Sequence, residues 1–155
     1  MKNEKLLKVS EQKGIAETLL NWLRTCPYIP SGLKLDYQYL GNKSGLSLHT
    51  LSGTIKRVEY IDGSYEGVYP FAIYLRDIPD SNNTRLDCTD ILDMIGSWVD
   101  GQNEYPDLGD NRSVSTIETI TNSTLVKRFE NGVDDYMITF ELIYVKGADY
   151  SWLYQ

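Results

Sequence analysis

The chain has few of the residues that carry catalytic chemistry or covalent cross-links. Its 155 residues include two cysteines, Cys26 and Cys88, and one histidine, His49. Two cysteines without CxxC spacing are too few for a disulfide framework. We therefore expect both to be free and buried, as in a protein that folds in a reducing compartment. His49 has no cysteine or acidic residue at ligand spacing, which favours a structural or surface role over catalysis.

The sequence also lacks long apolar runs and an excess of positive charge. No segment approaches the roughly 20 apolar residues of a membrane span, and the N-terminal stretch lacks the apolar run of a signal peptide. The 22 acidic against 15 basic residues give a net charge of -7, the wrong sign for binding nucleic acid by neutralising phosphates. We therefore expect a cytoplasmic chain that binds neither membrane nor nucleic acid. Its acidic surface fits either simple solubility or a passage through which DNA slides without binding.

Sequence motifs for catalysis and cofactor binding are absent. There is no GxSxG elbow and no GxGxxG or GxxxxGK loop. Four carboxylates lie before and within the second predicted helix: Asp80, Asp87, Asp90 and Asp93. The helix dipole and a solvated loop account for them, and a glycosidase-like pair or a cation site is the alternative. Glu104, Asp107 and Asp110 lack the spacing of a calcium-binding loop. We predict no catalytic residue, no metal and no cofactor.

Hydrophobic periodicity, by contrast, is clear along the chain. A chain of 155 residues buries about 70% of its extended surface on folding, so its core does not need disulfide or metal cross-links for stability. Two amphipathic helices are predicted, one over 10–25 with Ser10 as its N-cap and one over 84–99. Strand patterns cover 33–39, 46–50, 114–120, 125–129 and 135–145. Residues 100–112 are polar, contain Pro106 and glycines, and are expected to form an exposed loop.

The stretch over 53–77, GTIKRVEYIDGSYEGVYPFAIYLRD, predicts a β-hairpin on which the rest of the fold is organised. Asp62 and Gly63 supply turn residues that tolerate positive φ. Pro70 cannot donate to a sheet ladder, so we expect the ordered return strand to begin at or just after it. Apolar residues alternate along this return arm: Phe71, Ile73 and Leu75. Asn131-Gly132 predicts a second hairpin turn of the same kind.

The order of these elements indicates an α+β fold in a single domain over residues 1–155. Strands cluster before and after the second helix, which favours a mostly antiparallel sheet with two main helices packed on one face. A mixed sheet stays open as an alternative. Residues 1–9 are expected to be an N-terminal extension and residues 147–155 a C-terminal tail, although Trp152, Leu153 and Tyr154 in that tail are apolar.

Tyrosine is the one compositional excess, with 12 residues. Three tyrosines flank the first predicted turn, and tyrosine combines a large contact area with a polar tip, which suits protein interfaces. The alternative is that tyrosine is simply a favourable residue on a half-buried strand. We predict a subunit or partner interface that includes Tyr60, Asp62, Gly63, Tyr65, Tyr69 and Arg76.

Four segments together suggest a family. They are a short amphipathic helix ending before a Pro-rich turn, the YIDGSYEGVYPFAIYLRD hairpin, a helix carrying IGSWVD, and the closing TNSTLVKRFENGVDDYMITFELIYVK hairpin. In this order they resemble the phage minor capsid proteins of siphophages and prophages of Gram-positive bacteria. Those proteins are similar to tail terminators, the class that includes the phage lambda terminator. The resemblance covers about residues 10–146 and rests on hydrophobic and turn patterns.

The resemblance implies a virion structural protein and no enzyme. Such a subunit assembles in the host cytoplasm into a hexameric ring at the head-proximal end of a non-contractile tail. The ring stops polymerisation of the major tail-tube protein and joins a head-completion or connector protein, and DNA passes through it without specific binding. Two alternatives stay open. One is another neck component, such as a head-closure or connector protein. The other is a small hydrolase or ligand-binding domain that uses the acidic loop and His49.

Overall fold

The computed structural model of the chain describes the backbone of residues 5–6, 9–51 and 55–148, and the side chains of residues 13–51 and 56–148. Two helices lie in these residues, α1 (Val9–Leu23) and α2 (Asn82–Asp100). The strands of the described residues are β1 (Lys5–Leu6), β2 (Leu35–Tyr37), β3 (Gly45–Thr50), β4 (Ile55–Glu59), β5 (Tyr65–Asp77), β6 (Asp107–Gly109), β7 (Arg112–Arg128) and β8 (Asp134–Lys146). The predicted α+β class is confirmed.

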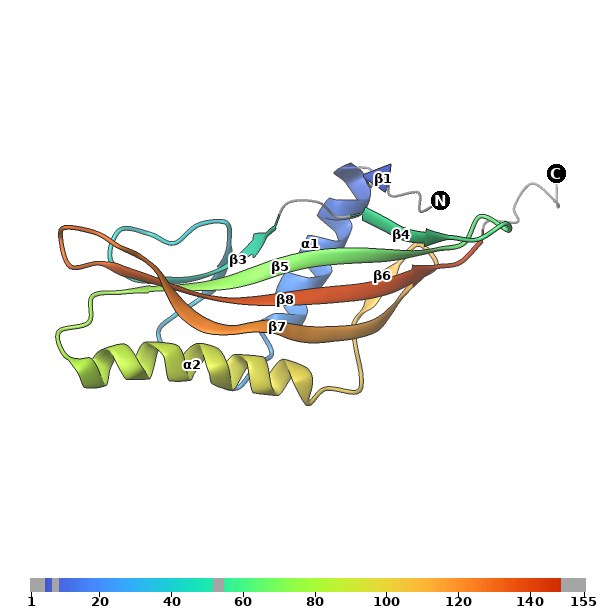
Figure 1. Ribbon diagram of the computed structural model, residues 1–155. Coiled ribbons are helices and arrows are strands. Elements are labelled where there is room, and N and C mark those ends of the chain that lie inside the picture. Colours follow the sequence, from blue (N-terminus) through green and yellow to red (C-terminus); the bar gives the residue numbers. More distant parts are fainter. Residues whose placement is uncertain (1–4, 7–8, 52–54, 149–155) are drawn as a thin grey trace.

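The strands form one 8-stranded sheet in the order β1-β4-β5-β8-β7-β6. Both β3 and β4 pair with β5 along the same edge, β4 with its first part and β3 with its second, while β2 lies outside β3. The β2–β3 pair is parallel and the other pairs are antiparallel, so the sheet is mixed and mostly antiparallel. Figure 1 shows that β5, β7 and β8 are long and that hairpins extend from both ends of the curled sheet.

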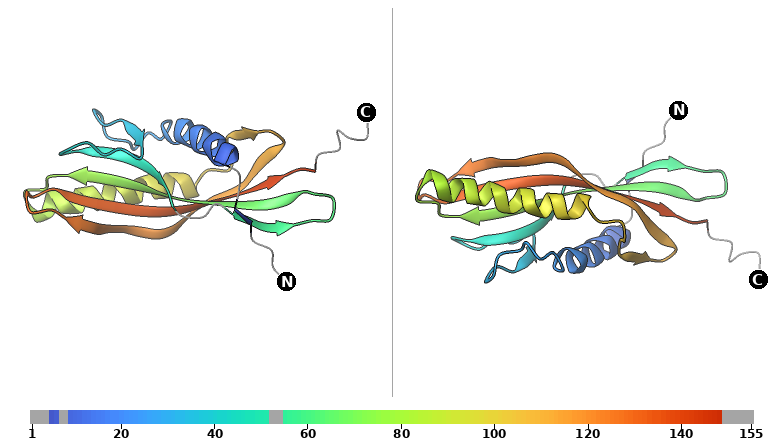
Figure 2. Two further views of the ribbon diagram at one scale, coloured as in Figure 1. Left: turned by 90° about the horizontal axis from the view of Figure 1, so that it is seen from above. Right: turned by 90° about the horizontal axis from the view of Figure 1, so that it is seen from below.

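Both helices pack on one face of this sheet, as predicted, and the two views of Figure 2 show the sheet curling around them. Odd-numbered residues of β5 and even-numbered residues of β8 point toward the helices, because side chains alternate along a strand. Phe71 and Phe140 are directly opposite each other there, and their rings stack with centroids 5.0 Å apart. The rings of Trp22 on α1 and Trp98 on α2, also 5.0 Å apart, join the two helices in one core.

Pro70 does not mark the start of the return strand, so that prediction is wrong. β5 begins at Tyr65 and runs through Pro70 to Asp77. The carbonyl of Pro70 accepts a hydrogen bond from the backbone N–H of Leu51 at 3.0 Å. In a strand the nitrogen and carbonyl of one residue face the same neighbour. The nitrogen of Pro70 therefore points to the same side of β5 as Leu51, between the residues of β5 that pair with β4 and those that pair with β3.

Three further boundaries differ from the predictions. Ser10 lies inside α1, which begins at Val9, and not at its N-cap. The segments 114–120 and 125–129 are one strand, β7, which absorbs the residues between them as register shifts against β8. The end of the 100–112 loop is the ordered strand β6, whose Leu108 is buried in the core. Gly53, Thr54 and the apolar residues of the predicted tail lie outside the described residues.

The β6–β7 turn explains how a polar stretch can form a hairpin. Gly109 and Arg112 are paired, and the two residues between them, Asp110 and Asn111, both have positive φ, 52° and 59°. A two-residue turn with positive φ at both positions matches the right-handed twist of its strands. Asp and Asn tolerate that conformation better than other residues with a side chain. The Asp110-Asn111 pair therefore encodes the turn without a glycine at either position.

Candidate functional site

The turn between β4 and β5 forms a tightly bonded loop, here called the hairpin tip and comprising residues 60–64. The N–H of Tyr60 donates to the carbonyl of Ser64 at 2.9 Å, and the N–H of Gly63 donates to the carbonyl of Tyr60 at 3.0 Å. Gly63 has a φ of 89°, as the left-handed residue of a three-residue hairpin loop requires. Asp62 contributes through its side chain, whose Oδ1 accepts hydrogen bonds from Ser64 N at 2.9 Å and Ser64 Oγ at 2.5 Å.

The turn between β7 and β8, residues 129–133, has the same hydrogen-bond pattern. Phe129 N donates to the carbonyl of Val133 at 2.8 Å, and Gly132 N donates to the carbonyl of Phe129 at 3.1 Å. Gly132 has a φ of 87°, and Asn131 Oδ1 accepts from Val133 N at 3.3 Å. The predicted Asp62-Gly63 and Asn131-Gly132 turns are thus two copies of one loop geometry, at opposite ends of the sheet (Figure 1).

The two loops differ in the residue exposed at the outermost position. In the β7–β8 loop it is Glu130, an ordinary solvated residue. In the hairpin tip the equivalent residue is Ile61, which is fully exposed, with a relative accessibility of 109%, and its neighbour Tyr60 is 55% exposed. Since the same loop geometry forms around Glu130, the loop itself does not require an apolar residue there. Ile61 is therefore a candidate contact residue that the sequence-based prediction did not include.

Tyr65 and Tyr69, two predicted interface residues, lie in the core. They are 5% and 0% exposed, because both are odd-numbered residues of β5 and face the helices. The ring of Tyr65 meets that of Tyr144 edge-on, with centroids 6.4 Å apart. The Tyr69 hydroxyl is hydrogen-bonded to Thr50, and burial raises the pKa of Tyr69 well above its ordinary value. Tyr60, Asp62 and Gly63 are the predicted residues that lie at the tip.

Arg76 lies at the other end of β5, away from the tip. Its guanidinium forms two hydrogen bonds to the Asp135 carboxylate, Nε–Oδ1 at 2.7 Å and Nη2–Oδ2 at 2.8 Å, and a third to the carbonyl of Gly41 at 2.7 Å. The hydrogen bonds to Asp135 and the charge of its carboxylate raise the pKa of the guanidinium above its ordinary value. The structure does not bring Arg76 together with the hairpin tip. Within the chain it connects β5 to β8 and to the loop before β3.

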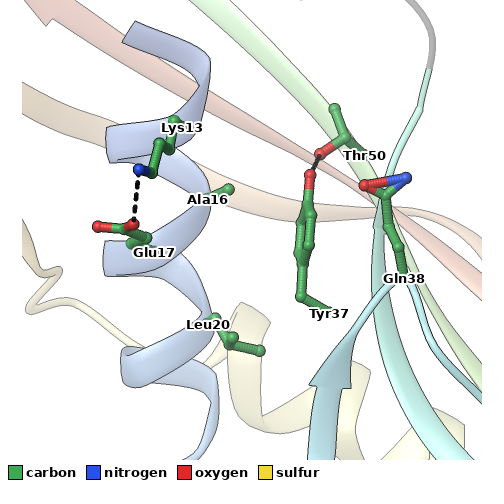
Figure 3. A pocket seen from close by; sticks show the side chains of 7 residues that line it. All are labelled: Lys13, Ala16, Glu17, Leu20, Tyr37, Gln38 and Thr50. Atoms are coloured by element: carbon green, nitrogen blue, oxygen red, sulfur yellow. Dashed lines mark hydrogen bonds and ion pairs between the residues drawn. The ribbon is translucent and has the colours of Figure 1, made fainter. Parts of the chain in front are cut away.

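A groove of about 480 Å³ lies between α1 and the edge formed by β2 and β3. The residues lining this α1–β2 groove are Lys13, Ala16, Glu17, Leu20, Tyr37, Gln38 and Thr50. Figure 3 shows Ala16 and Leu20 of α1 pointing toward Tyr37, Gln38 and Thr50, while the charged ends of Lys13 and Glu17 meet each other on the other side of the helix. Ala16 and Leu20 supply apolar surface. The Tyr37 hydroxyl is 2.8 Å from Thr50 Oγ1 and supplies a polar wall.

Gln38, on the rim of this groove, has an unusual backbone conformation. Its φ is 50°, in the left-handed region that residues other than Gly, Asn and Asp seldom adopt. The chain holds this bend by a hydrogen bond from Gln38 N to the carbonyl of Leu48 at 2.9 Å, and by one from Tyr39 N to Ser47 Oγ at 2.9 Å. Such strained positions occur preferentially at binding sites. No sequence pattern predicts this groove, since its two walls come from separate elements of the chain.

The residues of the ligand-binding or hydrolase hypothesis are not gathered at one place. The His49 ring packs against Tyr74 with centroids 4.5 Å apart, on the second part of the β3–β5 pair. Asp107 and Asp110 line small grooves at the β6–β7 end, and His49 lines neither. Burial lowers the pKa of His49, opposed by the charge of Asp135. In the part of the chain that the structure describes, no group of three or more His, Cys, Asp and Glu residues is placed to hold a metal ion.

The cysteines are free and buried, as predicted. Burial, with a further contribution from Asp77, raises the pKa of Cys88 to about 12. Burial also raises the pKa of Cys26. Because the thiolate is the nucleophilic form, both side chains are held in the unreactive thiol state near neutral pH.

Two carboxylates of α2 have a role that the sequence did not predict. The first turn of α2 contains no acidic residue, so helix-dipole stabilisation does not explain their number. Asp100 Oδ1 instead accepts a hydrogen bond from Thr119 N at 2.8 Å, and Asp93 Oδ1 accepts one from Ser123 N at 3.1 Å. Both donors lie where β7 shifts register against β8. The two carboxylates thus satisfy backbone groups that the sheet ladder leaves free, and α2 covers this strand.

No protein-family model matches the chain, and no curated protein sequence matches it. Neither of the described helices is long and apolar enough to cross a membrane. The exposed apolar hairpin tip and the α1–β2 groove are accordingly the two surfaces from which a function can be argued.

Proposed function

We propose that the chain is a virion structural protein of a siphophage or prophage, a tail terminator. It closes into a ring, hexameric by the family resemblance, at the head-proximal end of the tail. There it stops polymerisation of the tail-tube protein and provides the surface to which the head is joined. The proposal combines the resemblance in segment order with one observation on the molecule. That observation is Ile61, fully exposed at the end of a hydrogen-bonded hairpin where the matching loop carries Glu130.

A ring requires a heterologous interface, in which one patch of each subunit meets a different patch of the next. The subunit has two unlike surfaces that suit this arrangement. The hairpin tip exposes the apolar side chains of Ile61 and Tyr60, and it extends beyond one end of the sheet (Figure 1). The α1–β2 groove is concave and partly apolar. A subunit with only one such surface would favour a closed dimer.

The edges of the sheet favour contacts through side chains over strand-to-strand pairing. Asp93 and Asp100 of α2 bond the N–H groups of β7 at one side. On the other side, β1 pairs with the first two residues of β4, and the rest of β4 has an irregularity between Lys56 and Val58 and carries charged residues. Bulges and charges on edge strands prevent another strand from adding to the sheet. Uncontrolled growth by sheet extension is therefore disfavoured, as a protein that ends a polymer requires.

The proposal is tested by electron microscopy of purified tail-tube protein polymerising with and without this chain. We expect tubes of limited length with ring density at one end when the wild-type chain is present. The matched control is Ile61→Glu, which copies the residue of the twin loop and should leave tubes long and uncapped. Tubes that grow unchanged with the wild-type chain would contradict the proposal. Binding to connector rings and not to tube ends would instead identify a head-closure or connector protein.

A further inference from the structure

We infer that the hairpin tip of one subunit inserts into the α1–β2 groove of the next copy, so that each subunit gives one tip and receives another. The inference rests on the proposed function, because it describes how the proposed ring is closed. Its occupant is a second copy of this chain, and the groove residues become specificity-determining contacts.

The chemistry of the two surfaces is complementary. Ile61 offers an aliphatic side chain, and the groove offers the apolar surface of Ala16 and Leu20. Tyr60, half exposed beside Ile61, has a hydroxyl that matches the amide and hydroxyl groups on the opposite wall, from Gln38 and Tyr37. Aromatic residues with one polar end are enriched at the centres of protein interfaces.

Charges near the two surfaces are also complementary. The groove rim carries Lys13 and Glu17, whose mutual ion pair is 3.9 Å long with side chains 77% and 67% exposed. An exposed pair of that length contributes little to stability, so both charges are free to take other partners. The hairpin carries Asp62 at its tip and the exposed Arg57 on β4. A chain with a net charge of -7 repels its own copies, so opposite charges at the contact matter for specificity.

A subunit cannot place its tip in its own groove. Thr50, on the groove wall, pairs with Phe71, six residues along β5 from Tyr65 at the base of the tip. At about 3.3 Å per residue, this separation is about 20 Å along the strand. The tip also points away from the sheet, beyond the end of β5 (Figures 1 and 2). Any tip that fills a groove therefore belongs to another molecule.

The small size of the contact favours a ring over a stable dimer. A few side chains of one tip bury far less than the roughly 800 Å² per partner of a standard stable interface. Two subunits joined by a single tip are therefore expected to dissociate readily. When a ring closes, every subunit makes two such contacts, and the last one forms within a single assembly at a high effective concentration.

Cysteine cross-linking tests the contact directly. The native Cys26 and Cys88 are 5% and 1% exposed, so they give little background. One chain carries Ile61→Cys at the tip and another carries Glu17→Cys on the groove rim. Mixed under mild oxidation, the two full-length chains are expected to give a disulfide-linked heterodimer. A chain with both substitutions should give a ladder of bands that ends at the number of subunits in the ring.

The control pair is Glu130→Cys with Glu17→Cys, which puts the cysteine on the twin loop at the other end of the sheet. It should cross-link at least about tenfold more slowly than the Ile61 pair, since the twin loop is not expected to enter the groove. Ile61→Cys chains that link only to each other would overturn the inference in favour of a symmetric dimer. Equal rates for the two pairs would overturn it as well.

The outcomes separate this inference from the proposed function. Rings that cap tail tubes without any link between positions 61 and 17 would overturn the tip-to-groove contact and leave the terminator proposal standing. A specific link between these positions in a chain that never caps tubes would support the contact and count against the terminator proposal. Absence of both, at protein concentrations up to millimolar, would overturn both.

Discussion

Arg76 and Asp135 form a two-bond ion pair across β5 and β8, and the same guanidinium also bonds the carbonyl of Gly41. The side chains are 20% and 9% exposed, so water screens the pair only weakly. Three segments of chain therefore meet at one cation, at the end of the sheet opposite the hairpin tip.

Removing this cation should destabilise the subunit. We expect Arg76→Ala to lower the free energy of unfolding by about 2–4 kcal/mol, because Asp135 is left buried without its partner. Urea unfolding followed by circular dichroism measures the change. The exposed Lys43, replaced by Ala, serves as the control and should change stability by less than about 0.5 kcal/mol. An Arg76→Ala variant with unchanged stability and impaired assembly would contradict this structural role and support the interface role that the sequence predicts for Arg76.

The hairpin tip allows assembly to be separated from folding. Ile61→Glu should leave the free energy of unfolding within about 0.5 kcal/mol of wild type, since Ile61 is fully exposed and Glu130 occupies the same loop position elsewhere. Self-association should be lost. Tyr65→Asp, at a residue that the sequence assigns to the interface, is instead expected to unfold the chain, because Tyr65 is buried. Circular dichroism and light scattering on the two variants check both statements.

His49 predicts a pH dependence of stability. Its folded pKa lies below the ordinary value, because burial disfavours the charged ring. Between that folded pKa and the unfolded value of about 6.5, the unfolded chain binds more protons. Stability due to the neutral ring is therefore complete above about pH 6.5 and decreases as the pH falls below it.

Comparison with His49→Gln isolates this contribution. The variant should show a flatter change of unfolding midpoint between about pH 7 and 5 than the wild type does. The groups around the ring are Tyr74, at 4.5 Å between centroids, and the charge of Asp135. Identical slopes for the two proteins over this range would show that His49 titrates as it does in the unfolded chain.

Gly67 is required by the ring of Tyr144 directly opposite it. A Cβ at Gly67 would lie 2.3 Å from Tyr144 Cζ, far inside van der Waals contact. We expect Gly67→Ala to cost about 1–3 kcal/mol in stability through overpacking, measured by thermal or urea unfolding. Gly67→Ala should lower the free energy of unfolding less in a Tyr144→Leu background than in the wild-type chain. An equal loss of stability from Gly67→Ala in the two backgrounds would contradict this explanation.

The local features of the fold were predictable from the sequence, and the long-range ones were not. Helical periodicity and the Asp-Gly and Asn-Gly pairs located both helices and both hairpin turns, because each signal lies within a few residues. The single apolar Leu108 in a polar stretch gave no strand pattern, so β6 was missed. The bonds of Asp93 and Asp100 depend on register shifts in β7 that no local pattern shows.

The misplacement of Tyr65 and Tyr69 has one identifiable cause. Phe71, Ile73 and Leu75 correctly indicate that odd-numbered residues of β5 face the core. Extending this alternation backwards puts Tyr65 and Tyr69 on the same buried face. The expected break at Pro70 stopped that extension, although β5 runs through Pro70 and pairs with β8 on both sides of it. The α1–β2 groove needed the positions of two distant elements and could not be derived from either one.

The unbroken pairing of β5 and β8 gives the subunit a mechanical property. All 13 residues of β5, from the base of the hairpin tip to Asp77, have a partner on β8. A pull on the tip along the strand loads these bonds in shear, so that many must break together before the strand slides. A pull across the short β2, with three residues, would instead open its bonds one after another. The subunit is therefore stiff along the direction of its hairpin and yielding at the edge that forms one wall of its groove.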